Sequence, residues 1–66
     1  MKFISCTILS RSMVQDFDSV DSAIGFIDRN VDKGFFSAYI RVLESQEEFT
    51  FWFSNQESML DNLMNL

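Results

Sequence analysis

The amino-acid sequence predicts a small α+β domain in which two helices cover one face of a β-sheet. Apolar and polar residues alternate in several segments, which is typical of strands with one buried face. Two other segments carry apolar residues at helical spacing. The 66 residues allow only one small core, so all these elements are expected to form a single domain, residues 1–66.

The first strand is expected at residues 2–9, KFISCTIL. Ile4, Cys6 and Ile8 alternate with the residues between them, and β-branched residues are frequent in this segment. Residues 10–17 fit either a short second strand or a loop packed on the core. The sheet is therefore expected to have three strands, or four if residues 10–17 also form a strand.

The next segment predicts a helix that begins after Asp18, its expected N-cap, and ends just before Gly34. Its apolar residues follow one another at steps of three and four, which places them in one stripe. These residues are Val20, Ala23, Ile24, Ile27 and Val31. The stripe is the side of the helix that we expect to pack on the sheet.

Residues 35–44 and 49–54 predict two further strands, because both alternate between apolar and other residues. The segment between them, residues 45–48, lacks the Gly or Asn that tight two-residue turns prefer, so a loop of four or five residues is expected. Ser54 and Glu57 then fit the capping box S-x-x-E, which begins a second helix. The predicted order is β-α-β-β-α.

The same alternation assigns the side chains to the two faces of the sheet. One set is apolar and is expected to face the helices: Phe36, Ala38, Ile40, Val42, Phe49, Phe51 and Phe53. Two short helices can cover only one face, so the other face is expected to stay open. Its larger residues are expected to be Phe3, Leu9, Tyr39, Arg41, Leu43 and Trp52.

An open face that carries Trp52, Tyr39, Arg41 and Phe3 has the composition of a protein-binding surface, because Trp, Tyr and Arg are enriched in binding hot spots. The simpler interpretation is that Trp52 and Tyr39 form a cross-strand pair that only stiffens a hairpin. If the face does bind, its occupant is either a second copy of the chain or a different protein.

Charge argues against one class of function. The chain has ten Asp and Glu against five Lys and Arg, and its net charge is −5. Nucleic-acid binding needs cations that displace the counterions around phosphates, so no direct nucleic-acid binding is expected. The acidity favours a protein partner with a basic surface.

Two acidic clusters are candidate contacts for such a partner. Asp21, Asp28 and Asp32 share one side of the first predicted helix, where a row of carboxylates could imitate the phosphates of DNA. The simpler interpretation is a solvated helix face. The second cluster, at the predicted hairpin loop, could merely keep the loop soluble and the strand ends from pairing with neighbours. It consists of Glu44, Glu47 and Glu48.

The sequence gives little support for catalysis. It has no histidine, one cysteine and no glycine-rich phosphate loop, so no enzyme, metal site or cofactor is expected. Cys6 falls on the core-facing side of its strand and is expected to be an inert, buried thiol. No stretch approaches the ~20 apolar residues of a membrane span. A cytoplasmic protein with a reduced cysteine is expected.

Small size, acidity and abundant aromatic residues without catalytic groups are shared by many stoichiometric inhibitors, such as phage anti-host proteins, antitoxins and nuclease immunity proteins. The sequence therefore favours a small acidic inhibitor that blocks a basic surface of a partner protein, for example a nucleic-acid-binding one. The alternative is a structural homodimer that associates through its open sheet face.

Overall fold

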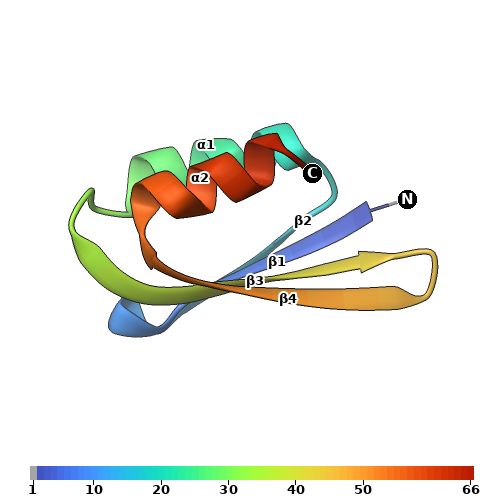
Figure 1. Ribbon diagram of the computed structural model, residues 1–66, viewed down its shortest axis with the longest axis horizontal. Helices are drawn as coiled ribbons and strands as arrows, with labels where there is room; N and C mark the ends of the chain where they lie inside the picture. Colours follow the sequence, from blue (N-terminus) through green and yellow to red (C-terminus); the bar gives the residue numbers. More distant parts are fainter. Residues whose placement is uncertain (1) are drawn as a thin grey trace.

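The computed structural model describes residues 2–66 as two layers, a four-stranded antiparallel sheet and two helices on one of its faces (Figure 1). The elements in chain order are β1 (Lys2–Ile8), η1 (Leu9–Arg11), β2 (Met13–Phe17), α1 (Val20–Asn30), β3 (Phe35–Glu44), β4 (Glu47–Asn55) and α2 (Gln56–Met64). Neither α1 nor α2 is long and apolar enough to cross a membrane.

The expected α+β class with two helices is confirmed, but the predicted three-stranded sheet and the order β-α-β-β-α are wrong. Met13–Phe17 form a strand that pairs with β1, so the order is β-β-α-β-β-α and the four-stranded alternative is the correct one. The pattern was hard to recognise because β2 lies at an edge of the sheet. Only Met13 and Phe17 of its five residues are partly buried.

The strand order β2-β1-β3-β4 places β1 and β3 in the centre of the sheet. Because β1 is antiparallel to both β2 and β3, those two strands run parallel, and α1 connects them by crossing over the sheet. Neighbouring side chains on paired strands share a face. Cys6 is paired with Ile40 on the helix side, whereas Thr7 is paired with Tyr39 on the open side.

The core lies between the sheet and the helices, as the alternation predicts. Its most buried sheet residues are Ile4, Cys6, Ile8, Ala38, Ile40 and Val42, and the helices add Ala23, Phe26, Ile27, Met59 and Leu63. The three Phe of β4 are less buried than expected, since β4 is an edge strand. Phe51 and Phe53 are only partly buried, and Phe49 is 46% exposed. The β3–β4 hairpin reaches past the ends of both helices (Figure 1).

Both helices begin one residue later than expected. Ser19 is the N-cap of α1 and accepts a hydrogen bond from the Ser22 amide, while Asn55 does the same for the Ser58 amide in α2. Each helix start has two adjacent residues that can act as N-cap, Asp18–Ser19 and Ser54–Asn55, so the sequence pattern alone does not select one. The first helix ends at Asn30 rather than near Gly34.

A buried glutamine joins the two helices. Gln56, the first residue of α2, donates its Nε2 hydrogens to the main-chain oxygens of Val31 at 2.8 Å and Ile27 at 3.4 Å. Val31 is the C-cap of α1, and the Ile27 oxygen also accepts the Val31 amide at 3.0 Å. The side chain therefore fixes the start of α2 against the end of α1.

The turn between β3 and β4 differs from the expected four- or five-residue loop. Glu44 pairs with Glu47, so only Ser45 and Gln46 connect the strands. Both have positive φ, 51° and 71°, as primed two-residue turns require. Such turns match the twist of paired strands. The long β3–β4 pairing therefore imposes a primed turn on Ser45 and Gln46, although neither is the Gly or Asn that such turns prefer.

Candidate functional site: the open face of the sheet

The face of the sheet opposite the helices carries a concentration of exposed apolar side chains. Phe3 is 49% exposed, Leu43 46% and Trp52 66%. Val14 of β2 is exposed on the same face, because it is paired with Thr7, which is paired with Tyr39. Exposed apolar patches are common at interaction sites, so this face is the candidate binding surface.

An aromatic pair crosses β3 and β4 on this face. The ring centroids of Tyr39 and Trp52 are 4.7 Å apart and their planes are inclined by 50°. The expected cross-strand pair is therefore present, with the two rings in a tilted contact. The pairing leaves most of the indole accessible, so stiffening the hairpin and binding a partner are compatible roles.

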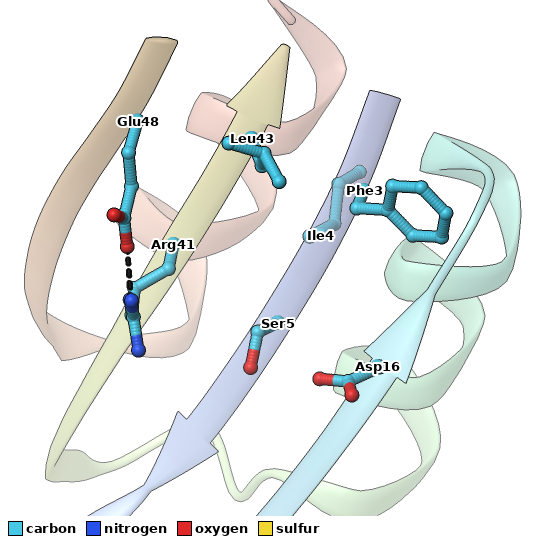
Figure 2. A pocket seen from close by; sticks show the side chains of 7 residues that line it. All are labelled: Phe3, Ile4, Ser5, Asp16, Arg41, Leu43 and Glu48. Carbon is cyan, nitrogen blue, oxygen red and sulfur yellow. Dashed lines mark hydrogen bonds and ion pairs between the residues drawn. The ribbon is translucent and has the colours of Figure 1, made fainter. Parts of the chain in front are cut away.

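Next to this pair the open face is hollowed, with a volume of about 410 Å³ (Figure 2). Ser5 of β1 lies at its floor, between its strand partners Asp16 of β2 and Arg41 of β3. The small serine side chain leaves space between these longer neighbours. Phe3 and Leu43 form the apolar side of the hollow.

The charged side of the hollow is built from residues on three strands. Arg41 donates from Nε to Glu48 Oε1 at 2.6 Å, and this hydrogen bond raises the pKa of Arg41. Asp16 forms no ion pair within residues 2–66. A ligand group in the hollow would thus meet one available carboxylate, a guanidinium already held by Glu48, and an apolar wall.

The structure divides the residues that sequence reasoning selected as a binding site. Phe3, Tyr39, Arg41, Trp52 and Glu48 come together on the open face. The other two glutamates of the hairpin lie at its end, where Glu44 pairs with Lys2 at 3.4 Å and Glu47 is exposed. Asp21 and Asp28 are exposed on α1, in the opposite layer of the molecule.

The predicted row of three helical carboxylates is interrupted. Because α1 ends at Asn30, Asp32 lies outside the helix. Arg11 donates to Asp32 Oδ2 at 2.7 Å and to the main-chain oxygen of Asn30 at 3.2 Å. A cation at the carbonyl end of a helix is stabilising, so Asp32 and Arg11 together fix the end of α1.

The sequence does not identify two residues of the open face, Val14 and Asp16. Both lie in residues 10–17, which fit either a strand or a loop, so alternation does not assign them to a face. The available signal is that Met13, Gln15 and Phe17 occupy every second position, as residues on one face of a strand do. Pairing with β1 brings these three residues to the helix side. Alternation along the first strand assigns Ser5 to the open face, but its small size alone does not identify it as the floor of a hollow.

The thiol of Cys6 is buried on the helix side and is not accessible from the open face. Burial, and to a lesser degree the nearby Asp16 carboxylate, raises its pKa to about 12. The thiol therefore stays protonated and is a poor nucleophile. Within residues 2–66 no group of three or more His, Cys, Asp or Glu side chains is arranged to hold a metal ion.

Comparison with known proteins gives no significant match to a protein family, a curated protein or a solved structure.

Proposed function

We propose that this chain is a small protein-binding module that holds a partner on the open face of its sheet and inhibits it stoichiometrically. The observation that carries the proposal is the exposure of Trp52 on the same face of the sheet as a hollow that Phe3 and Leu43 line. A rigid, amphipathic aromatic ring beside a hollow is a typical binding hot spot. The Tyr39–Trp52 contact supplies the rigidity.

Charge indicates what kind of partner fits this face. Arg41 and Glu48 at the hollow pair with each other, and Asp16 has no ion pair within residues 2–66, whereas Glu44 and Glu47 lie at the hairpin end on the helix side of the sheet. A partner that presents Lys or Arg around an apolar contact would be complementary to it. If those cations normally bind nucleic acid, the bound module would block them.

Phosphate mimicry by α1 has weaker support. Only Asp21 and Asp28 remain in the helical row, since Asp32 lies beyond the helix and is paired with Arg11. Both residues belong to the layer opposite the open face, so a partner seated on Trp52 would have to wrap around the molecule to reach them. The open face and α1 would therefore bind different partners.

A structural homodimer that stacks two open faces is the second candidate. The exposed apolar residues would be covered in such a dimer, which would help a core this small. However, stacking brings the Asp16 carboxylates of the two faces into one interface, and Asp16 has no ion pair within residues 2–66. Like charges at close quarters are unfavourable, so a basic partner fits better.

The proposal is tested by capturing a partner from a lysate of the source cells and measuring its affinity for matched variants. We expect Trp52→Ala to weaken binding about 30-fold or more, because loss of a hot spot costs on the order of 2 kcal/mol. The double variant Asp21→Asn, Asp28→Asn should bind as the wild type does. The opposite result, with only the double variant impaired, would place the binding site on α1.

A further inference from the structure

The outer edge of β4 is an unoccupied pairing surface. β4 is nine residues long and lies at the edge of the strand order β2-β1-β3-β4, so no described strand pairs with its outer side. An edge strand presents a row of unpaired N–H and C=O groups that can pair with another chain.

The two edges of the sheet are protected to different degrees. β2 has only five residues, which makes it a poor template. β4 contains neither Lys nor Pro, and its pairing with β3 is regular from Glu47 to Phe53. Its protective charges are confined to Glu47 and Glu48, at one end of the strand.

The hairpin geometry shows which backbone groups of β4 point outward. Glu44 and Glu47 close a two-residue turn, so they form a hydrogen-bonded pair. Bonded and non-bonded pairs alternate along an antiparallel ladder, which directs the groups of Phe49, Phe51 and Phe53 toward β3. The outward groups then belong to Glu48, Thr50, Trp52 and Ser54.

We propose that β4 pairs with β4 of a second copy of this chain, antiparallel and centred on Phe51. This register uses all nine residues of the strand, and a shift by two residues in either direction shortens it. It places Thr50 opposite Trp52 of the second copy in a hydrogen-bonded pair.

Charge and apolar contacts favour the same register. Glu47 and Glu48 face Asn55 and Ser54 of the second copy, so the acidic end of each strand meets a neutral polar end. The exposed ring of Phe49 gains Phe53 of the second copy as its neighbour on the helix side. The absence of facing like charges and the shared apolar contacts together favour a second copy as the occupant of this edge.

The pairing joins two four-stranded sheets into one of eight strands. Both open faces lie on the same side of that sheet, and the two Trp52 rings are diagonal neighbours across the new pair of strands. Each Trp52 also contacts its own Tyr39. The dimer thus presents a continuous aromatic band. The inference is independent of the proposed function, because either a monomer or a dimer could bind a partner.

Sedimentation equilibrium of the free protein at about 100 µM tests the pairing by mass action. We expect a dimer of the 7.7 kDa chain. Thr50→Pro removes an outward N–H without touching a β3–β4 hydrogen bond, and should weaken self-association at least about tenfold. Thr50→Val keeps the N–H and is the control, with wild-type self-association.

Amide hydrogen exchange on the wild type tests the same pairing even if the Thr50→Pro variant does not fold. The amides of Thr50 and Trp52 should be protected in concentrated protein and exchange on dilution, while that of Phe51 stays protected at both concentrations. A monomer at about 100 µM would overturn the inference. A second contradicting result would be a dimer that is weakened by Leu43→Lys but not by a folded Thr50→Pro variant. That pattern would indicate a dimer of stacked open faces.

Discussion

Replacing Ile40 by alanine is expected to lower the free energy of unfolding by about 3–4 kcal/mol, because it leaves a cavity at a site that cannot collapse. Ile40 is completely buried in the central strand β3, with Cys6 and Phe51 as its strand partners. A domain of this size has a total stability of only about 3–10 kcal/mol, so the loss is a large share of it. Urea denaturation followed by circular dichroism measures the change.

Arg41→Ala is the matched control, one residue further along the same strand. Arg41 is exposed on the open face, and its ion pair with Glu48 also lies at the surface. Exposed pairs contribute about 0–1 kcal/mol, so this variant should remain close to wild-type stability. A larger loss for Arg41→Ala than for Ile40→Ala would mean that the two faces of the sheet have been interchanged.

Replacing Gln56 by glutamate is expected to cost about 3 kcal/mol at neutral pH, since it places a carboxylate against carbonyl oxygens in a buried position. The side-chain amide now donates to Val31 and Ile27, and a carboxylate has no hydrogen to donate. A negative charge in the first turn of a helix is favourable by only about 0.3–1 kcal/mol, so burial outweighs it. Thermal and urea denaturation at several pH values measure the effect.

The pH dependence identifies the cause of this loss. Burial and the neighbouring carbonyl oxygens raise the pKa of the introduced carboxyl above its unfolded value of about 4.3. The variant should therefore approach wild-type stability below about pH 4, where the protonated acid can donate, and lose stability as pH rises. Gln56→Met is the control, with a smaller loss that does not depend on pH. If Gln56→Glu is as stable as the wild type at pH 7, the side chain does not hold the end of α1.

Much of the fold was predictable because the strands with one buried face alternate clearly. In β3, Ala38, Ile40 and Val42 are buried while Tyr39 and Arg41 point to the open face, as the sequence indicates. β2 was not predictable in the same way. It is short, lies at an edge and buries only its two ends in part, so its sequence carries little periodic signal.

The features that escaped prediction depend on contacts between distant segments. Arg11 and Asp32 are 21 residues apart, and Gln56 is 25 residues from Val31. Nothing local marks these pairs, because each depends on how α1 is placed over the sheet. The Ser45–Gln46 turn is a different case, since long strand pairing overrides a weak local preference.

The candidate site was partly predictable for the same reason. Tyr39, Arg41 and Trp52 could be placed on the open face from alternation, and the Tyr39–Trp52 contact follows from the pairing of their strands. The hollow could not be predicted, because it needs Asp16 of β2 beside Ser5 of β1. The hollow depends on β2, and the sequence of β2 does not by itself predict a strand.

The fluorescence of Trp52, the only tryptophan in the chain, reports whether a partner covers the open face. In the free protein its indole is 66% exposed, so acrylamide should quench it readily and its emission should be that of a solvated indole. With a tryptophan-free form of the captured partner bound, we expect the emission to shift to shorter wavelength and the quenching constant to fall several-fold, because a hot-spot ring is desolvated on binding. Unchanged emission and quenching in a saturated complex would mean that the partner binds elsewhere.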